Sequence, residues 1–334
     1  MPRYKESGVD FDSVAAFRNA IIGELTFKGT RFKRAAKIGH YSGLVSFNGN
    51  YVAIHTDNVG TKTILALEHG YFNEIGYDLV GMNVNDIVCM GAEPMAMVNY
   101  VAGSMMGKEL GKAIGKSIND ACVEAGISMV GGETASVPDL VKGIDISGTV
   151  IGNLEKGKEI TGKRIKERDR VIGLRSSGIH SNGFSLIRKI YENKSDVLEE
   201  RIEGEKFWKT LLRGTKIYSK KIFEVTQEFD VHGISHITGG GVRNLLRLKD
   251  SRYRLIYPEI PAIFRKIMQD GGISNQEAFE VFNMGIGMMV ITSKREEDAI
   301  MKELDMFKPV DLGEVGLGKG VSVDNYGVKY ENYY

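Results

Sequence analysis

The apolar positions in the first half of the chain switch between helical and strand-like spacing. Residues 11–27 carry apolar side chains at intervals of three and four, which predicts an amphipathic helix. The segments "YVAIHT" (51–56) and "PMAMVNYVA" (94–102) are apolar and partly β-branched, which predicts two strands. Helices are also predicted over 75–90 and 108–125, the second ending at Gly126 in the C-cap position.

A charged segment separates this half from a second one. Residues 154–170 are rich in charge and poor in large apolar side chains, which predicts a surface linker. Beyond it, the same mixture of strand-like and helical spacing returns. The elements predicted here are the strands "RVIGLRS", "VHGISHIT" and 285–293, the helices 181–193, 216–228 and 294–304, and a helix beginning near Val242.

The two halves predict two domains. With 334 residues the chain is long for a single core. Because both halves mix strands and helices, we expect an α/β fold of the α+β type. We place the domains at residues 1–158 and 168–334.

Composition narrows the class of protein. The formal net charge is +1, so no global field favours nucleic acid or an acidic membrane as a partner. Cys89 and Cys122 both fall in predicted helices, which argues against a disulfide framework. The first residues lack a signal-peptide pattern, and no run of eighteen apolar residues occurs, so we expect a cytoplasmic protein without a membrane span.

The first candidate for chemistry is the stretch "TDNVGTK". Asp57 ends a predicted strand, where a carboxylate is free to bind a hard cation. Gly60 and Thr61 follow in a turn whose backbone N–H groups could face phosphate oxygens, and Lys62 adds a point charge. The alternative is an Asx-type turn with a solvated lysine.

A second candidate lies in the predicted helix 75–90. Asn83 and Asp86 stand three residues apart and therefore share a face. The helix around them is apolar, so both side chains need partners. These partners could belong to a ligand site, or the two residues could simply form a structural amide–carboxylate pair.

A third candidate is "GGET". We expect "ISMVGGETA" and "IDISGTVIGN" to be strand ends that meet glycine loops, with Gly131 and Gly132 allowing close approach of a ligand. Glu133 then projects from the loop. Mg²⁺ in proteins is usually held by one or two carboxylates together with substrate phosphates. The trio Asp57, Asp86 and Glu133 therefore suits nucleotide-bound magnesium better than a closed protein cage.

Two further segments follow strands in the second half. "SSGIHSNG" precedes a predicted helix, and the N-terminus of a helix is a natural anion site. His180 in this segment could transfer a proton, bind an anion or be structural. The other polar residues of this segment are Ser176, Ser177, Ser181 and Asn182.

The second of these segments is "HITGGG". Three consecutive glycines, Gly239, Gly240 and Gly241, cost backbone entropy, which favours a functional loop. His232 and His236 would lie about 13 Å apart on a strand, which is too far to hold one metal ion.

The order of these motifs resembles the aminoimidazole ribonucleotide synthetase family, also called phosphoribosylformylglycinamidine cyclo-ligases. Each motif alone is weak, but seven in order, spread over both halves, are specific. The matching segments are "YKESGVD", "TDNVGTK", "DLVGMNVNDIVCMGAEP", "GGETA", "SSGIHSNGFSLIRK", "HITGGG" and "FNMGIGM".

The resemblance implies a function and an architecture. Formylglycinamidine ribonucleotide, a phosphorylated small molecule, would be closed to aminoimidazole ribonucleotide with ATP and Mg²⁺. The protein would be a homodimer whose N-terminal mixed sheets pair into a barrel, with an α/β sandwich as the C-terminal domain.

The resemblance also implies roles for individual residues. It assigns Asp57, Asp86 and Glu133 to the metal. It assigns the triphosphate to Lys62 with the Gly60 and Thr61 backbone. The further residues that it assigns to the nucleotide are Asn83, Asp86, Gly131 and Gly132. His180, Lys62 and Asp57 would be catalytic. The substrate would contact Ser176, Ser177, His180, Ser181, Asn182 and Gly239–Gly241.

The sequence departs from the family pattern at three places. Asn58 replaces the glycine that usually follows the aspartate, and "GHYSG" (39–43) replaces a glycine-rich loop thought to fold over the nucleotide. Ser136 stands where an acidic residue usually follows the alanine of "GGETA". Two alternative functions therefore stay open. One is an ATP-dependent enzyme of the same superfamily with another substrate, and the other is a non-catalytic nucleotide-binding paralogue.

Overall fold

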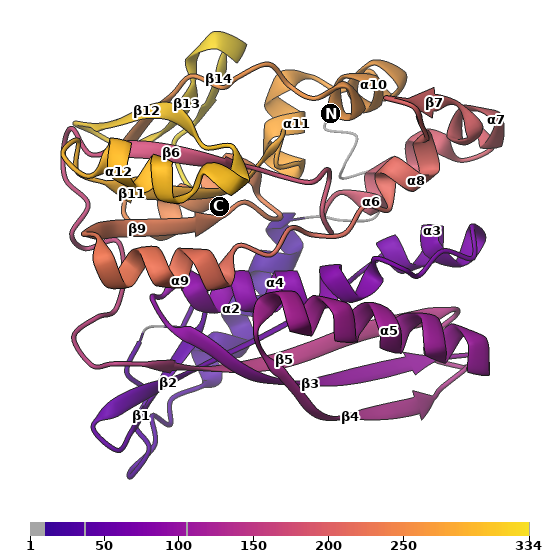
Figure 1. Ribbon diagram of the computed structural model, residues 1–334, viewed down its shortest axis with the longest axis horizontal. Coiled ribbons are helices and arrows are strands. Elements are labelled where there is room, and N and C mark those ends of the chain that lie inside the picture. The colour runs from indigo at the N-terminus through magenta and orange to yellow at the C-terminus, as the bar shows by residue number, and fades with distance from the viewer. Residues whose placement is uncertain (1–10, 37, 105, 334) are drawn as a thin grey trace.

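The computed structural model describes residues 11–36, 38–104 and 106–333, so the motif "YKESGVD" (4–10) lies outside the described residues. The described chain contains two main sheets joined by a connecting segment (Figure 1). The first sheet uses strands up to Leu154, and the second begins at Arg170. The predicted α/β fold with two sheet-containing halves is confirmed.

The first sheet has five strands in the order β1-β2-β5-β3-β4. β3 and β4 are parallel and the other neighbours are antiparallel, so the sheet is mixed as expected. Its strands are β1 (Gly43–Phe47), β2 (Asn50–Asn58), β3 (Glu93–Gly103), β4 (Ser128–Ser136) and β5 (Ile144–Leu154).

One face of this sheet is covered by helices, and the other, the bare face, carries no helix in the described part of the chain. α4 (Ile75–Cys89) and α5 (Lys108–Ala125) pack over one face, between the two sheets (Figure 1). α5 ends as expected at Gly126, which has a φ of 71° in the left-handed region. Apolar side chains remain exposed on the opposite face, among them Ile54, Val98, Tyr100 and Ile151.

Helix α4 is the central element of the fold. Fourteen of its 15 residues are buried, because it contacts α5, β2 and β5 on one side and β9 and α9 of the second half on the other. A helix that is apolar nearly all round is typical of a fully buried position. The predicted helix 75–90 is therefore confirmed almost to the residue.

The second sheet has seven strands in the order β14-β13-β10-β12-β6-β11-β9. Only β10 and β13 are parallel among its neighbouring strands. The strands are β6 (Arg170–Arg175), β9 (Val231–His236), β10 (Arg252–Leu255), β11 (Ile286–Thr292), β12 (Val310–Gly316), β13 (Gly320–Val323) and β14 (Val328–Tyr330). A small hairpin is formed by β7 (Arg201–Ile202) and β8 (Glu205–Lys206).

Helices surround this second sheet and connect its strands. The α-helices are α6 (Phe184–Tyr191), α7 (Ser195–Glu199), α8 (Phe207–Leu211), α9 (Ser219–Glu228), α10 (Ala262–Gly271), α11 (Asn275–Val281) and α12 (Glu297–Glu303). The short 3₁₀ helices are η1 (Gly241–Arg247), η2 (Asp305–Phe307) and η3 (Asp324–Tyr326). None of the helices in the described part of the chain is long and apolar enough to span a membrane.

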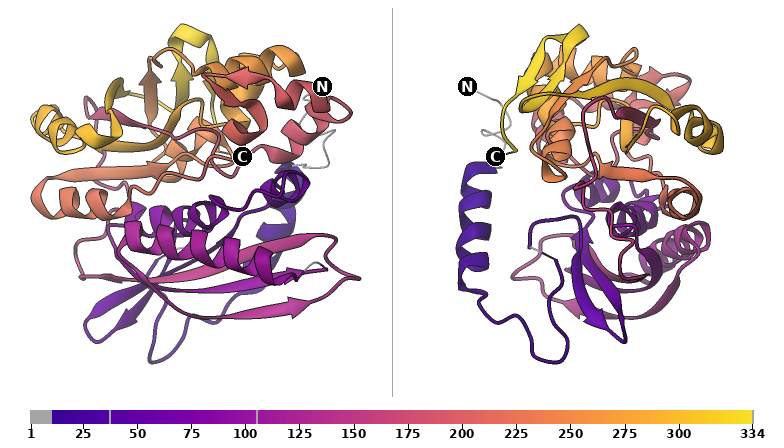
Figure 2. Two further views of the ribbon diagram at one scale, coloured as in Figure 1. Left: turned by 45° about the vertical axis from the view of Figure 1, so that its right-hand side comes forward. Right: turned by 90° about the vertical axis from the view of Figure 1, so that its left-hand side faces the viewer.

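Several predicted boundaries are wrong. The first helix, α2 (Phe11–Glu24), ends three residues early, and it stands away from the body of the molecule (Figure 2). The helices expected over 181–193, 216–228 and 294–304 are shorter, and the helix expected near Val242 is the 3₁₀ helix η1. A helix that was not predicted, α3 (Lys62–Glu68), begins directly after Thr61.

The expected glycine loops of the first half are strands. Gly131 and Gly132 lie inside β4, paired with Val98 and Asn99, and "IDISGTVIGN" lies wholly within β5. An added Cβ at Gly132 would lie 1.8 Å from the Asn99 Oδ1 atom, so a close side chain explains this glycine without a ligand.

Glycine at the contact between α4 and α5 yields a stability prediction. An added Cβ at Gly76 would lie 2.2 Å from the backbone of Ser117 and Ile118. We expect Gly76→Ala to lower the free energy of unfolding by at least about 2 kcal/mol, measured by urea denaturation, because neither helix can move without unpacking the core. Gly115→Ala is the control. No atom lies within 4 Å of its added Cβ, so its stability should stay equal or rise by up to about 1 kcal/mol. Equal midpoints for both variants would contradict the proposed close contact.

Candidate functional site

The structure brings Asp57 and Asp86 together from a strand and a helix. Alternation along β2 places Asp57 on the same face as the buried Ala53, the face that α4 covers. Asn83 joins the two elements, since its Oδ1 accepts a hydrogen bond from the Asp57 backbone N–H at 3.1 Å. Burial and the negative charge of Asp86 raise the pKa of Asp57. The two carboxylates are therefore close enough to interact unfavourably, and a bound cation would relieve this interaction.

Two histidines contact Asp86. His236 Nδ1 lies 2.7 Å from Asp86 Oδ1, and His55 Nε2 lies 3.5 Å from Asp86 Oδ2. Burial alone would raise the pKa of Asp86, but these histidines lower it below its ordinary value. Asp86 is thus an ionised carboxylate with oriented neighbours. His55 could have been found from the sequence, because it stands two residues before Asp57 and so shares its strand face.

Glu133 does not join this pair. β4 is three strand spacings from β2, about 14 Å. Glu133 is exposed and lies opposite Tyr100, whose side chain lies on the bare face of the sheet. The prediction that Asp57, Asp86 and Glu133 form one metal site is therefore wrong within one chain, because Glu133 lies on the other face of the sheet. No cluster of three or more histidine, cysteine, aspartate or glutamate residues in the described ranges could hold a metal ion.

The glycine-bearing turn after Asp57 is present but differs from the expectation. Gly60 adopts a φ of 72°, and Thr61 precedes the first residue of α3. The Thr61 hydroxyl lies 3.2 Å from the Ser185 hydroxyl of the second half. Asn58 is the last residue of β2 and lacks a positive φ, so the usual glycine is not needed there.

Lys62 is fully buried, so both readings of this lysine from the sequence need correction. Its Nζ lies 2.6 Å from Asp78 Oδ2 and donates to the carbonyl oxygens of His180 and Arg213 at 3.1 and 2.7 Å. A solvated lysine is thereby excluded. A contact with a triphosphate does not fit either, because all three ammonium protons are directed at protein oxygens.

The segment "SSGIHSNG" forms a loop that contacts α4 through Ser181. Several of its side chains form hydrogen bonds with other parts of the chain. Ser176 donates to Asn283 Oδ1, Ser177 to the Gly214 carbonyl and Ser181 to Asp78 Oδ1, at 3.1, 2.6 and 3.0 Å. The loop's backbone conformation is therefore held rigidly by hydrogen bonds.

His180 is turned into the protein. Only 2% of its surface is exposed, and its Nε2 accepts from the backbone N–H groups of Ser177 and Lys216 at 3.4 Å. Burial and the nearby His236 and Lys62 charges hold the pKa of His180 well below its usual range. A neutral imidazole in this position favours a structural role over the predicted proton transfer.

The two predicted substrate loops do meet. An added Cβ at Gly239 would lie 3.4 Å from the Asn182 side chain, so "SSGIHSNG" and "HITGGG" are neighbours. Gly240 and Gly241 adopt φ values of 95° and 54°, and an added Cβ at Gly241 would lie 1.8 Å from the Phe279 carbonyl oxygen. The glycines are thus required by backbone conformation and by close packing.

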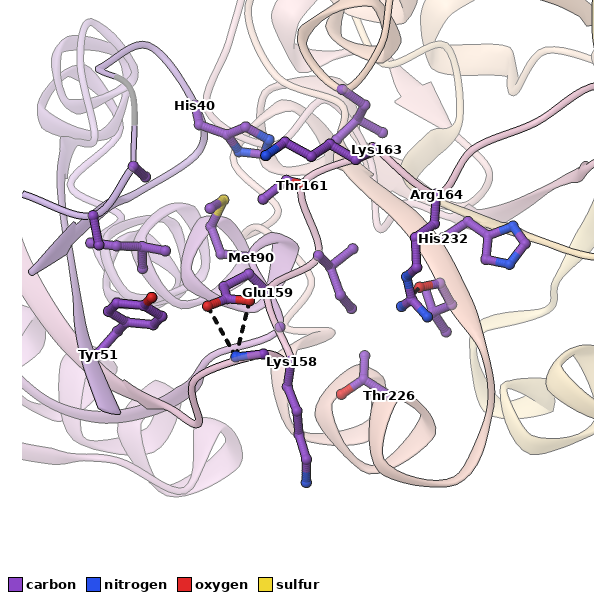
Figure 3. A pocket seen from close by; sticks show the side chains of 18 of the residues that line it. His40, Tyr51, Met90, Lys158, Glu159, Thr161, Lys163, Arg164, Thr226 and His232 are labelled. Atoms are coloured by element: carbon purple, nitrogen blue, oxygen red, sulfur yellow. Dashed lines mark hydrogen bonds between the residues drawn. The ribbon is translucent and has the colours of Figure 1, made fainter. Parts of the chain in front are cut away.

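A cavity of about 990 Å³ lies at the junction of the two halves (Figure 3). Its lining comes from the segment before β1, from Tyr51 and Met90, from the connecting segment and from η1. Cationic side chains are prominent, and Figure 3 labels Lys158, Lys163 and Arg164 among them. The volume falls at the upper end of the range typical of ligand pockets.

Arg247 connects the cavity to the carboxylates. Its guanidinium stacks 4.1 Å from the Tyr41 ring centroid and donates to the His40 carbonyl at 3.1 Å. No carboxylate in the described part of the chain lies within ion-pair distance of it, and its charge lowers the pKa of Asp86. Tyr41 in turn contacts Ser235 Oγ at 2.6 Å, so the "GHYSG" segment is anchored to the second half.

The architecture defines a class of fold. The chain superimposes on a HypE protein solved in a HypE–HypF complex, with a TM-score of 0.68 and 19% identity over 95% of this chain and 98% of that one. It also superimposes on AaThiL complexed with AMPPCP and TMP, with a TM-score of 0.66 and 14% identity over 97% of this chain and 96% of that one. At these identities the likeness concerns the fold alone.

Sequence comparison defines the family within that class. The descriptions "AIR synthase related protein, N-terminal domain" and "C-terminal domain" match residues 39–154 and 166–324. A phosphoribosylformylglycinamidine cyclo-ligase of Pyrococcus furiosus is 43% identical over 99% of this chain and 100% of the relative, and one of Methanocaldococcus jannaschii is 41% identical over 90% and 88%. The chain belongs to the AIR synthase related family.

His40 in the cavity wall yields a prediction on pH. Burial, followed by the charge of Arg247, lowers the pKa of His40 to about 4 in the folded protein, while the unfolded value is 6.5. The folded state therefore binds this proton more weakly, and its stability falls as pH decreases from 6.5 toward 4.

The variant His40→Asn removes this titration but keeps an oxygen near Nδ1, which accepts from the Tyr41 N–H. Relative to this variant, the wild-type protein should lose up to about 3 kcal/mol of stability between pH 6.5 and 4. Urea denaturation at several pH values measures the difference. A difference that stays constant over this range would contradict the lowered pKa.

Proposed function

We propose that the chain catalyses the ATP-dependent ring closure of formylglycinamidine ribonucleotide to aminoimidazole ribonucleotide, a step of purine biosynthesis in the cytoplasm. The observation that carries this proposal is 43% identity to a phosphoribosylformylglycinamidine cyclo-ligase over nearly the full length of both chains. In the reaction, the formyl oxygen of the substrate is phosphorylated by ATP, which releases ADP. The amidine nitrogen then attacks the same carbon and phosphate leaves. Phosphorylation is needed because an amide oxygen is otherwise a poor leaving group.

The nucleotide is assigned to the region where β2 packs on α4. Asp57, Asp86 and the Gly60 turn lie toward one end of this contact, and Tyr51 and Met90, which line the cavity, lie toward the other. We place the triphosphate near the carboxylates and the base in the cavity. Arg247 lies between the two places without a carboxylate partner among the described residues, which suits a role in binding phosphate oxygens.

A divalent cation fits between the carboxylates of Asp57 and Asp86. Asp57 and Asp86 are the two hard oxygen donors that Mg²⁺ commonly takes from a protein when substrate phosphates supply the others. The raised pKa of Asp57 beside Asp86 indicates a site with excess negative charge. When bound, the ion would neutralise charge on the transferred phosphoryl group. Asn83 and His236 would hold the two carboxylates in orientation.

The phosphorylated substrate is assigned to the two loops of the second half. Asn182 and Gly239 lie beside one another, and the loops approach α4 from the same side. Gly239 is half-buried and has no side chain to cover its backbone N–H group, which suits an anionic ligand. In this arrangement the chain orients two substrates and excludes water, and orientation of this kind supplies a large part of the rate enhancement in phosphoryl transfer.

A homodimer fits the bare face of the first sheet. Ile54, Val98 and Ile151 are exposed on three neighbouring strands, β2, β3 and β5, with exposed fractions of 41%, 42% and 37%. An antiparallel sheet tolerates one solvated face when that face is polar, but here a group of apolar side chains is exposed on it. We propose that a second copy of this chain covers it.

The assay for the proposed function combines formylglycinamidine ribonucleotide, ATP and Mg²⁺ and measures ADP and the aminoimidazole product. We expect substrate-stimulated ADP release with equimolar product. Asp57→Asn should lower kcat/KM at least about tenfold, because a charged contact to the nucleotide is lost. Asp139→Asn, at an exposed carboxylate, should not change it. ATP binding without turnover would point to the non-catalytic paralogue, and turnover with another acceptor to a different superfamily member.

The dimer is tested by a charge on the bare face. Ile54→Glu should convert the protein to a monomer in sedimentation velocity, because a carboxylate would be buried without a partner at the interface. Val123→Glu is the control, since Val123 is 74% exposed on α5, away from this face. A wild-type monomer, or an Ile54→Glu protein with the mass of the wild-type dimer, would refute this interface.

A further inference from the structure

The strongest unassigned feature is the buried ion pair between Lys62 and Asp78. Both side chains have no exposed surface, and Nζ and Oδ2 lie 2.6 Å apart. Burying an ion pair costs several kcal/mol per charge, and well-packed apolar residues often replace such pairs without loss of stability. The pair is therefore poorly explained by stability alone, and its other partners indicate what it does.

The partners of the pair come from both halves of the chain. Lys62 is the first residue of α3 and Asp78 lies in the first turn of α4, both in the first half. Lys62 donates to the His180 carbonyl, and Asp78 Oδ1 accepts from the Ser181 hydroxyl at 3.0 Å. The pair thus forms hydrogen bonds with two consecutive residues of the "SSGIHSNG" loop, His180 and Ser181.

A second segment of the second half is fixed in the same way. Thr215 donates to Asp78 Oδ1 through its backbone N–H and its hydroxyl at 3.0 and 2.8 Å, and the Arg213 carbonyl accepts from Lys62. This segment in turn holds the loop, because the Gly214 carbonyl accepts from Ser177 and the Lys216 N–H donates to His180. The loop is therefore held twice, directly by the ion pair and indirectly through residues 213–216.

Because of the position of Lys62 in the sequence, the ion pair also connects the loop to the turn that follows Asp57. Lys62 follows Gly60 by two residues and Asp57 by five, so the turn assigned to the triphosphate continues directly into the lysine. A single neutral hydrogen bond would hold the loop near this turn only weakly. A buried ion pair holds it more strongly, because moving the loop away would leave a charge buried without its partner. Burial lowers the pKa of Lys62 and raises that of Asp78, while each charge opposes the shift of the other.

We propose that Lys62 and Asp78 are positioning residues that fix the Ser176–Gly183 loop relative to the Asp57–Gly60 turn, and that neither contacts ATP or substrate. This inference rests on the proposed function in one respect only, the assignment of the loop to the phosphorylated substrate. It replaces the direct role in triphosphate binding that the sequence pattern suggests for Lys62.

The test uses the double variant Lys62→Met/Asp78→Asn in the full-length chain. Methionine keeps the length of the lysine stem and asparagine keeps a hydrogen-bond acceptor, so the variant buries no unpaired charge. The control is Lys116→Met/Asp120→Asn, which removes an exposed ion pair of α5 with Nζ and Oδ2 2.6 Å apart. Thermal unfolding establishes that both proteins are folded. If the double variant does not fold, Thr215→Val replaces it, because it removes one bond between residues 213–216 and Asp78 and leaves both buried charges paired.

Two measurements decide the outcome. Hydrogen exchange of the backbone amides of residues 176–183 and 213–216 should become at least tenfold faster in the double variant and stay unchanged in the control. By calorimetry, affinity for ribose 5-phosphate, a probe of the substrate side, should fall at least tenfold, while affinity for ATP with Mg²⁺ should change less than threefold.

Each alternative has its own signature. Unchanged exchange in the loop would overturn the inference. A loss of ATP affinity larger than the loss of ribose 5-phosphate affinity would also overturn it and return Lys62 to the triphosphate. Faster exchange with unaltered ribose 5-phosphate affinity would leave the positioning role intact. That result would overturn the proposed assignment of the loop to the substrate instead.

Discussion

Helix α4 lies buried between two sheets, and the rest of the structure depends on this constraint. A helix buried on all sides has no solvated face on which to place a polar residue, so every polar side chain must find a partner in a neighbouring element. The partners here all come from elements that α4 separates. Asp78 bonds Ser181 and Thr215, and Asn85 bonds the Lys216 carbonyl and the Tyr218 N–H. The polar residues of one helix therefore fix the relative placement of both halves.

The same constraint builds the site. Asn83 and Asp86 lie one turn apart on the face of α4 that meets β2 and β9, and they bond Asp57 and His236 there. Because a buried polar group without a partner costs about 1–3 kcal/mol, these contacts are held in one arrangement before any ligand binds. Orientation of carboxylates in advance is what metal and phosphate binding require. The same residues thus contribute to fold stability and to site geometry. A substitution on the face of α4 that carries Asn83 and Asp86 therefore affects both.

The sequence predicted the elements better than their relations in space. The hydrophobic pattern located α4 because it is long and apolar, and α5 because it is long and strongly periodic, and the ordered motifs located the family. Glycine was misleading, however. Gly131 and Gly132 were expected in a loop, but they lie in a strand, and at Gly132 the neighbouring side chain of Asn99 leaves no room for a Cβ. A local pattern cannot distinguish a glycine required by a ligand from one required by a side chain of the next strand.

Residue type alone also failed to predict which charges meet. Asp57, Asp86 and Glu133 were grouped because each is a carboxylate near an element boundary. Strand order and side-chain alternation then place Glu133 on the opposite face of the sheet. The sequence does not contain the strand pairing directly, so this placement could not be predicted from it. His55 and His236 complete the surroundings of Asp86 instead. His55 could have been predicted from the sequence, because side chains two residues apart on a strand share a face. His236 could not, because its position depends on the contact between α4 and β9.

Two of the departures from the family pattern, Asn58 and the "GHYSG" segment, have different physical consequences. Asn58 continues β2 in an extended conformation, and the left-handed turn occurs at Gly60, so the replaced glycine costs nothing in backbone strain. The "GHYSG" segment changes more. Its Tyr41 is buried, bonds Ser235 and stacks on Arg247, so side-chain contacts fix a segment that a glycine-rich sequence would leave free. Arg247 is also the cation between the cavity and Asp86. A ligand that binds Arg247 must therefore compete with the Tyr41 ring or share the guanidinium with it, which couples nucleotide binding to the contact between the two halves.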